Sequence, residues 1–274
     1  MGRKIYLGII YSITALCMIF GACFHVFNFV ENSIFNDFFG KVSGNGSQVQ
    51  KEEALSSFDN MNLDLSVMSV TISKGDSYKI SYNCSEKFVP RYEVKDGTLY
   101  VTQDDLHLNL TDVNNPKCSL TITVPTDSLS DLTAQVDVGD LLLKDITLSN
   151  LDISADVGDL DITNVTTENC TIQADVGDVN LKDIEMKTGT IDANVGDIEI
   201  KDIDFTSLEI MADLGDVDVL DVTSLEDYRI DLETDLGDVS VDKKEHKREY
   251  FSEGSGDKKL TIYVSTGDID VTSR

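Results

Sequence analysis

The sequence predicts an all-β fold: a single-domain parallel β-helix, or β-solenoid, of about 19 residues per coil, preceded by an N-terminal transmembrane helix. The first observation is a four-residue phrase, Asp-Val-Gly-Asp or a close variant, that begins at Asp137, Asp156, Asp175, Asn194, Asp213 and Asp235. Its central glycines are each 19 residues apart from Gly139 to Gly215, and Gly237 and Gly267 follow after 22 and 30 residues. Such a period indicates stacked coils, because no single coil buries its own apolar side.

The second observation is the alternation of apolar residues inside each repeat, whose first residue we number place 0. Apolar residues fill place 1 (Val138, Val157, Val176, Val195), place 4 (Leu141, Leu160, Val179, Ile198), place 6 (Leu143, Ile162, Leu181, Ile200), place 9 (Ile146, Val165, Ile184, Ile203) and place 16 (Ile153, Ile172, Ile191, Ile210), and place 18 is always alanine. Places 14, 16, 18 and the next place 1 are two apart, the period of a strand with one buried face. Coils stacked about 4.8 Å apart would superpose these residues as buried columns.

The third observation is that the apolar spacing slips from two to three at two points of each repeat. One slip falls at Gly-Asp, in places 2 and 3, and the other at place 8, which holds Asp145, Asn164, Asp183, Asp202 and Asp221. Glycine accepts positive φ, and Asp and Asn side chains hydrogen-bond nearby amides, so these residue types suit corners. We therefore expect two or three short strands in each coil.

The N-terminus predicts a membrane anchor. Residues 1–4 include two basic residues, and residues 5–24 (IYLGIIYSITALCMIFGACF) carry no charge. A run of this length crosses a bilayer as a helix, and the flanking charges predict a cytoplasmic N-terminus. Because apolar character continues to Val30, we assign residues 1–4 to a cytoplasmic tail and 5–30 to the anchor. The remaining residues are then extracellular, in a single-pass protein of the cell membrane.

Two other processing routes fit the same segment. A cleaved secretory signal shares the charged start and apolar centre, although no clean Ala-x-Ala site follows. Phe20-Gly21-Ala22-Cys23 is a poor version of a lipobox, in which Cys23 would be acylated and the preceding segment removed. All three routes place the rest of the chain beyond the membrane.

The rest of the chain divides by its patterning. We expect a juxtamembrane linker over residues 31–56, whose Gly- and Ser-containing stretch is a flexible spacer. The solenoid covers 57–274, with irregular N-terminal coils or a cap at 57–130, regular repeats at 131–241, an insertion at 242–259 and a last coil at 260–274. Irregular ends are expected because a solenoid end exposes unpaired strand edges.

The composition excludes nucleic-acid binding. The net charge is −28, and residues 131–238 hold 29 acidic and 5 basic side chains. Such a field repels DNA and RNA, and the repeats contain no basic patch. It also repels anionic membrane surfaces and wall polymers unless cations intervene.

The cysteines do not form a disulfide framework. Cys170 occupies place 14 and is predicted to be a buried small hydrophobe. Cys84 and Cys118 lie in the predicted cap, where a disulfide outside the cell is an open alternative that spacing alone does not establish.

The acidic columns are the sharpest candidate site. Carboxylates repeated about every 5 Å repel one another, and calcium, which prefers oxygen ligands, would relieve that repulsion. The metal candidates are Asp137, Asp140, Asp156, Asp159, Asp175, Asp178, Asp197, Asp213 and Asp216. The competing interpretation, which we favour, is that these aspartates make corner hydrogen bonds and face solvent. No cofactor other than calcium is indicated.

The aspartate columns do not predict an active site. Some β-helix enzymes cut polysaccharides with clustered aspartates, but the columns here repeat evenly, whereas an active site needs one asymmetric constellation. We predict no catalytic residues. The insertion is basic and aromatic on an acidic body, so Lys243, Lys244, Lys247, Arg248, Tyr250 and Phe251 are candidate partner contacts. The alternative is a disordered, solvated loop.

Several segments together resemble a known family. They are the anchor, Phe58-Asp59, Val94-Lys95-Asp96-Gly97-Thr98-Leu99-Tyr100-Val101, Leu120-Thr121-Ile122-Thr123-Val124-Pro125 and the train of Gly-Asp-Val/Ile/Leu repeats. The segments resemble the bacterial putative-adhesin domain of unknown function, which includes LiaG-like membrane proteins of Gram-positive envelope-stress operons. The resemblance covers residues 58–274 and implies adhesion and an envelope-stress association, with no catalytic residues to carry over. Family members usually have Gly-Ser-Gly-Asp at the corner, so this chain is more acidic.

From these observations we expect an extracellular, non-enzymatic surface scaffold or adhesin-like interaction module held by an N-terminal anchor. Its partner would be a cell-envelope protein or a wall polymer. The alternative is a calcium-dependent binder of such a partner through the acidic columns, and polysaccharide cleavage is a distant third.

Overall fold

The computed structural model describes residues 48–103, 118–125 and 129–274, which belong to one compact unit. The predicted cytoplasmic tail, the anchor and most of the linker lie outside the described residues. In the part that is described, no helix is both long and apolar enough to cross a bilayer.

The described residues form strands, with two short 3-10 turns, η1 and η2. In chain order the elements are β1 (Gln48–Ala54), β2 (Asn60–Val67), β3 (Ser69–Lys74), β4 (Lys79–Ser85), η1 (Glu86–Phe88), β5 (Arg91–Lys95), β6 (Thr98–Thr102), β7 (Ser119–Val124), β8 (Asp131–Val138), β9 (Leu141–Thr147), β10 (Asn150–Val157), β11 (Leu160–Val176), β12 (Val179–Val195), β13 (Ile198–Leu214), β14 (Val217–Val222), η2 (Leu225–Asp227), β15 (Tyr228–Leu236), β16 (Val239–Val241), β17 (Lys244–Glu245), β18 (Glu249–Ser252), β19 (Lys258–Thr266) and β20 (Ile269–Ser273).

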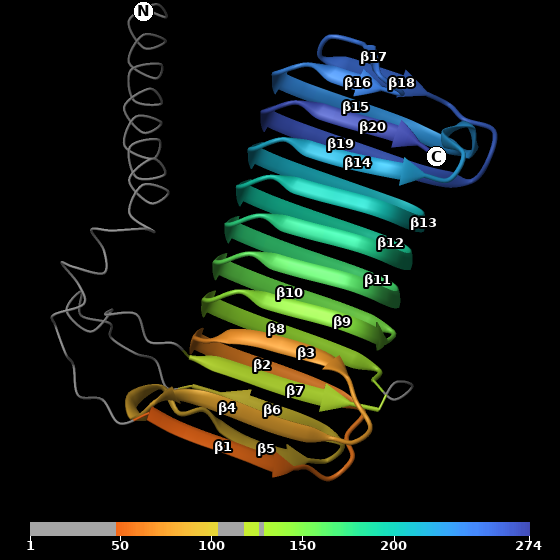
Figure 1. Ribbon diagram of the computed structural model, residues 1–274. Coiled ribbons are helices and arrows are strands. Elements are labelled where there is room, and N and C mark those ends of the chain that lie inside the picture. The colour runs from red at the N-terminus through yellow and green to blue at the C-terminus, as the bar shows by residue number, and fades with distance from the viewer. Residues whose placement is uncertain (1–47, 104–117, 126–128) are drawn as a thin grey trace, which may run out of the picture. The chain divides into compact units, whose positions relative to one another are not determined.

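Successive repeats pair in parallel at the 19-residue step (Figure 1). Ile153 pairs with Ile172, Ile172 with Ile191, and Ile191 with Ile210. All four of these side chains are fully buried. The superposition that the repeat predicts is therefore confirmed, and the chain forms a β-solenoid.

The regular coils contain longer strands than the sequence predicts. One coil is divided into β9 and β10, but β11, β12 and β13 each run for 17 residues through both walls of their coil. Within these strands the paired residues skip place 8, so the backbone bends there and resumes the same ladder. The prediction that every strand is short is therefore wrong for these three coils, because a bend at one residue does not end the pairing.

Both predicted corners are confirmed by the backbone angles. The residues at place 8 have φ of 57° at Asp145, 54° at Asn164, Asp183 and Asp202, and 59° at Asp221. At place 2 the glycines from Gly139 to Gly215 have φ of 141° to 148°. A Cβ on Gly196 would lie 2.0 Å from the carbonyl oxygen of Gly177 in the coil below, so this corner requires glycine for both conformation and space.

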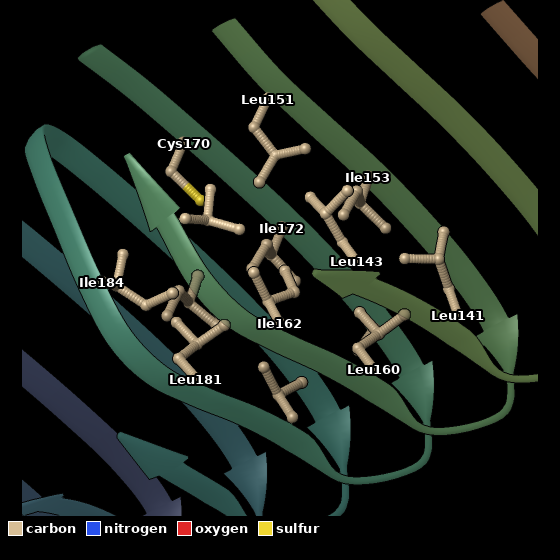
Figure 2. Close-up of a cluster of buried hydrophobic side chains, with 14 of the residues drawn as sticks. Leu141, Leu143, Leu151, Ile153, Leu160, Ile162, Cys170, Ile172, Leu181 and Ile184 are labelled. Carbon is tan, nitrogen blue, oxygen red and sulfur yellow. The ribbon is translucent and has the colours of Figure 1, made fainter. Parts of the chain in front are cut away.

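The core consists of columns of aliphatic side chains from both walls (Figure 2). Leu143, Ile162 and Leu181 come from one wall, and Ile153 and Ile172 face them from the other. Cys170 is buried in its column between Leu151 and Gly189, as predicted.

One predicted column is not in the core. The side chains at place 1 are exposed, from 36% at Val195 to 47% at Val157. The paired residues skip place 0, so the strand bends there and the next side chain points outward instead of continuing the alternation. The prediction that place 1 is buried is therefore wrong.

The N-terminal end of the stack does not follow chain order. β2 pairs with β6 on one side and β8 on the other, and β3 lies in the same way between β7 and β9. The coil formed by β2 and β3 therefore lies between β6–β7 and β8–β9, both of which come later in the chain. The antiparallel strands β4 and β5 then cover the end.

The linker predicted over residues 31–56 ends in a strand. β1 pairs antiparallel with β4, from Gln48 opposite Ser85 to Ala54 opposite Lys79. Val49 packs against the core, whereas Lys51 and Glu53 form an exposed ion pair of 2.6 Å. Residues 48–54 are therefore an edge strand rather than a spacer, and their charges discourage pairing with further chains.

The C-terminal end is also out of chain order (Figure 1). β19 pairs in parallel with β13 on one side and β15 on the other, and β20 lies between β14 and β16. The coil predicted to be last, residues 260–274, is therefore inserted between two earlier coils. The sequence spacing to Gly237 and to Gly267 is longer than 19 residues because of this insertion. After β14 the chain leaves one coil position open and forms β15 and β16, and it later fills the open position with β19 and β20.

Candidate interaction surfaces

The Asp-x-Gly-Asp corner forms a ladder of carboxylates along the stack. At place 3, Oδ1 of each aspartate except Asp238, the last in the stack, accepts a hydrogen bond from the backbone N–H of the place 3 aspartate in the next coil. The donor–acceptor distances are 3.2 Å for Asp159 to Asp140, 3.0 Å for Asp178 to Asp159, 2.9 Å for Asp197 to Asp178 and for Asp216 to Asp197, and 2.8 Å for Asp268 to Asp216 and for Asp238 to Asp268. The predicted corner hydrogen bonds are thus confirmed, and they run between coils.

The place 0 column is less completely paired. Nδ2 of Asn194 donates to Oδ1 of Asp175 at 2.9 Å, so one amide interrupts the row of charges. Burial raises the pKa of Asp137, and the neighbouring charges of Asp156 and Asp64 raise it further. Like charges therefore repel one another in this column.

Exposed aliphatic side chains lie between the two acidic columns. We call this row the apolar ridge, and it consists of Val138, Val157, Val176, Val195, Leu214 and Leu236. Leu236 at the C-terminal end is 58% exposed. Because neighbouring coils place these side chains about 4.8 Å apart, Val138 to Leu214 form a continuous apolar line with carboxylates on both sides, and Thr266 of the inserted coil separates Leu214 from Leu236. An apolar line flanked by charge is typical of a binding surface.

An acidic pocket of about 210 Å³ adjoins the same corner. It is lined by Asp178, Asn180, Asp197, Ile198, Glu199, Asp216 and Asp218. Burial is the first cause that raises the pKa of Asp218, and the charge of Asp270 in the inserted coil is the second. Among the residues that the structure describes, no group of three or more ligand side chains is arranged to hold a metal ion.

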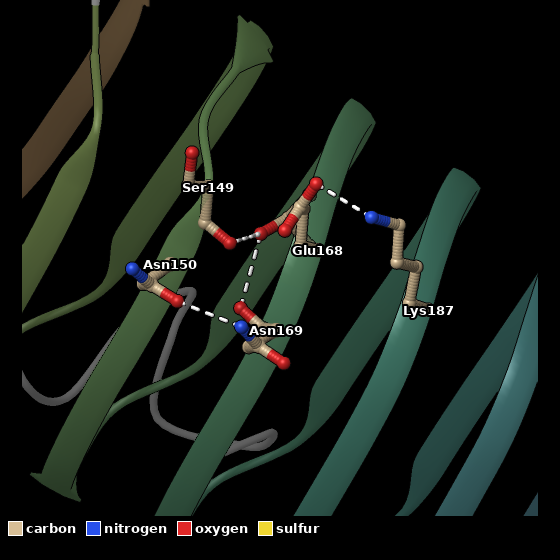
Figure 3. A network of polar contacts seen from close by, with 6 residues as sticks. Ser149, Asn150, Glu168, Asn169 and Lys187 are labelled. Carbon is tan, nitrogen blue, oxygen red and sulfur yellow. Dashed lines mark hydrogen bonds and ion pairs between the residues drawn. The ribbon is translucent and has the colours of Figure 1, made fainter.

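A second surface, the corner groove, runs across four coils at places 10 to 12. It encloses about 500 Å³ and is lined by Leu129, Thr147, Leu148, Ser149, Thr166, Thr167, Glu168, Glu185, Met186, Lys187, Asp204, Phe205, Thr206 and Lys258. Figure 3 shows part of its wall, where Glu168 and Lys187 form an ion pair of 2.6 Å. The hydroxyl of Thr167, nearly fully buried, lies 3.1 Å from the carbonyl oxygen of Ser149.

The groove ends at a contact network that joins three coils. Nζ of Lys258 forms an ion pair with Asp204 and lies 5.2 Å from the centre of the Tyr228 ring. Tyr228 packs on Phe205 with 4.8 Å between ring centres. The hydrogen bond to Asp204 raises the pKa of Lys258, whereas burial raises the pKa of Tyr228. Sequence reasoning missed this groove, because its residues differ from coil to coil and carry no repeated signature.

The predicted insertion covers the C-terminal end of the stack. β17 and β18 pair antiparallel with β16 and β15, so the alternative of a disordered loop is wrong for these residues. The backbone N–H of Thr234 donates to the carbonyl oxygen of Arg248 at 2.9 Å, and that of Val239 donates to Lys247. Residues 246–248 are thereby held against the last Asp-x-Gly-Asp corner.

The insertion brings the candidate contact residues onto one end of the molecule. Lys243, Lys244, Lys247 and Arg248 are exposed. Phe251 is also exposed, at 52%, and lies 5.4 Å from the Arg229 guanidinium, while Tyr250 is half-buried against His246. A cleft of about 580 Å³ is lined by the basic turn and by Glu233, Asp235 and Asp238. The basic turn therefore faces the chain's own carboxylates on one side and solvent on the other.

Comparison with known proteins identifies the architecture. The Toastrack DUF4097 family model matches residues 58–223, more than half of the chain. The chain is similar to a crystal structure of a putative adhesin from Bacteroides fragilis, with 18% identity, a TM-score of 0.54 and coverage of 82% of this chain and 96% of that one. It also matches a putative cell adhesion protein from Clostridium sporogenes, with 16% identity, a TM-score of 0.38 and coverage of 83% and 100%. No curated protein matches.

Proposed function

The chain belongs to the Toastrack DUF4097 family, and from that premise we propose that it is a non-enzymatic surface scaffold or adhesin-like interaction module. The observation that carries the proposal is the apolar ridge. It exposes one aliphatic side chain in each of several coils, between columns of carboxylates. Soluble proteins seldom expose an ordered apolar row of this length unless another molecule covers it.

The flanking charges restrict what covers the ridge. A partner must bring apolar groups to the ridge and positive charge, or cations, to the carboxylates on either side. A cell-envelope protein satisfies these requirements, and a wall polymer does so when cations bridge the two acidic surfaces. The regular spacing of the coils favours an extended partner that contacts several repeats at once.

A matched pair of variants tests the ridge. Val157→Ser, Val176→Ser and Val195→Ser together remove its centre without touching the core. The control replaces Asp152, Thr171 and Glu209 with serine, on the outer face of one wall. Binding of the full chain to isolated cell envelopes is then measured by sedimentation. We expect about a tenfold loss for the ridge variant, as for other buried apolar contacts, and none for the control. Equal binding by both variants would refute the ridge as the contact surface.

We further propose that residues 5–30 hold the solenoid at the outer face of a bacterial, Gram-positive cell membrane, with the N-terminus in the cytoplasm. The uncharged segment at residues 5–24 and the absence of a clean cleavage site support this orientation. Protease added to intact cells should remove the solenoid while a cytoplasmic N-terminal tag survives. The resemblance to LiaG-like proteins supports an association with envelope stress, which induction of the gene by wall-active agents would test.

A second candidate function is calcium-dependent binding of the same partner. The crowding around Asp218 favours it. Burial raises the pKa of this carboxyl, the charges of Asp270, Asp216, Glu199 and Asp197 raise it further, and a divalent cation would relieve their repulsion. The place 3 carboxylates other than Asp238 oppose it, since each already accepts a backbone hydrogen bond. Calorimetric titration with calcium, and melting with and without chelator, would decide. If calcium gives no heat of binding and no shift in melting temperature, calcium-dependent binding is refuted.

A further inference from the structure

We propose that Cys84 and Cys118 form a disulfide bond that fastens the N-terminal end of the solenoid. In the structure both are free thiols, and both side chains are nearly fully buried. The proposal does not depend on which partner the solenoid binds.

The strand register places the two cysteines opposite each other. β4 and β7 are antiparallel, with Tyr82 opposite Leu120 and Asn83 opposite Ser119. One more step of the same register brings Cys84 opposite Cys118. Residues directly opposite in an antiparallel pair have Cα atoms about 4.5 to 5.5 Å apart, and a disulfide spans about 4.4 to 6.8 Å. The spacing expected from this register is therefore within the range that a disulfide spans.

The environment of the two thiols agrees with this register. Burial raises the pKa of Cys84 to about 11, and the neighbouring Cys118 raises it further. Cys170, by contrast, lies in a repeat column between Leu151 and Gly189, and it is the only other cysteine within the described residues. Within the described residues there are therefore one pair placed for a bond and one isolated thiol that serves as an internal control.

The chemistry is a thiol–disulfide exchange. The two thiols lose two protons and two electrons as one S–S bond forms, and the electrons reduce a disulfide of the exchange partner to two thiols. That partner is a small-molecule disulfide such as oxidised glutathione, or a disulfide oxidoreductase. Because the raised pKa leaves little thiolate in the folded protein, the exchange takes place before β4 pairs with β7, or during local opening.

The position of the proposed disulfide indicates which part of the fold it would stabilise. β4 covers one wall at the end of the stack, where the coils lack a further neighbour. End elements of a repeat array are the first to open, since they make fewer contacts than internal coils. A bond between β4 and β7 would join the capping strand to the outer coil and raise the free energy of that opening.

Thiol labelling of the full chain tests the proposal directly. The protein is refolded with oxidised and reduced glutathione, unfolded, and alkylated with or without prior reduction, and its peptides are analysed by mass spectrometry. We expect the peptides that contain Cys84 and Cys118 to be joined and unlabelled before reduction, and each to gain one label afterwards. Cys170 should be labelled in both samples. Labelling of Cys84 and Cys118 without reduction would overturn the proposal.

A stability measurement separates the bond from simple packing. Reductant should lower the melting temperature of the oxidised protein by several degrees. It should have no effect on the Cys84→Ala, Cys118→Ala double variant, while the Cys170→Ala variant should keep the response. An equal response of the wild type and the double variant would show that no bond fastens this end. If the double variant fails to fold, the labelling experiment on the wild type still decides.

Discussion

Oδ1 of Asp197 accepts a hydrogen bond of 2.9 Å from the backbone N–H of Asp216, one coil further along the stack. The same bond recurs along the stack from Asp140 to Asp238, so aspartate side chains accept an equivalent backbone hydrogen bond at successive corners. The carboxylate therefore satisfies an amide that the turn would otherwise leave without a protein partner.

The first prediction concerns this acceptor. Asp197→Ala removes it, whereas Asp197→Asn keeps an oxygen in the same position and removes one negative charge. We expect the alanine variant to be less stable than the asparagine variant by about 1 kcal/mol, the usual net value of such a bond. Urea unfolding of both variants measures the difference, and identical midpoints would mean that the ladder contributes nothing.

The second prediction concerns the glycine at the corner. Gly196→Ala places a Cβ 2.0 Å from the carbonyl oxygen of Gly177, in a conformation with φ of 143°. We expect a loss of about 3 kcal/mol or more, because backbone strain and a backbone clash both contribute. Gly97→Ala is the control, since its Cβ meets no atom within 4 Å and only its φ of 79° is unfavourable. Comparable losses for the two variants in thermal unfolding would contradict the close approach of the coils.

The third prediction is a pH dependence. The raised pKa of Asp218 means that the folded state binds its proton more tightly than the unfolded state does, so ionised Asp218 destabilises the fold at neutral pH. Asp218→Asn should therefore gain stability at pH 7, by less than about 1 kcal/mol because the site is partly solvated. The gain should shrink as pH falls through the raised pKa and vanish below the ordinary value of 3.8. Asp231→Asn, on an exposed position of β15, should show no such gain, and parallel stability curves for the two variants would count against the crowding of Asp218.

The fourth prediction concerns the inserted coil. Deleting residues 258–274 removes β19 and β20, each of which pairs on both sides. We expect β13 to β16 to lose protection in amide hydrogen exchange, while β10 to β12 keep theirs, because repeat proteins transmit stability mainly between neighbours. A matched deletion of residues 48–54 removes a strand that, among the described strands, pairs only with β4, and it should affect only that end. Unchanged exchange in β15 after the first deletion would mean that β15 and β16 restack directly on β13 and β14.

The sequence predicted the repeat and its core because each column copies one environment many times. Ile153 and Ile172 occupy the same place in neighbouring coils, so the 19-residue step alone implies that they pair. The corners were predictable for the same reason, since the residues at place 8 are nearly all aspartate and all adopt positive φ. Place 1 was predicted wrongly because a strict period of two does not reveal a bend at place 0.

The ends and the groove were not predictable in the same way. Nothing local in residues 258–273 indicates that they pair with β13 rather than follow β16, because Gly267 suits the position next to Gly215 as well as the position next to Gly237. The network of Lys258, Tyr228 and Asp204 joins three coils and occurs once. Contacts that occur once produce no periodic pattern in the sequence, so they are seen only in the folded structure.

The placement of β19 and β20 makes the solenoid mechanically unequal at its two ends. Tension applied beyond β20 pulls on a coil that is hydrogen-bonded along both flanks, so two ladders must shear together before it is extracted. Tension applied before β1 acts on a strand held by a single neighbour, which can peel away one bond at a time. Under load the molecule should therefore yield first at β1, and the unravelling should stop at β2, the next strand in the chain, which is paired with β6 on one flank and β8 on the other.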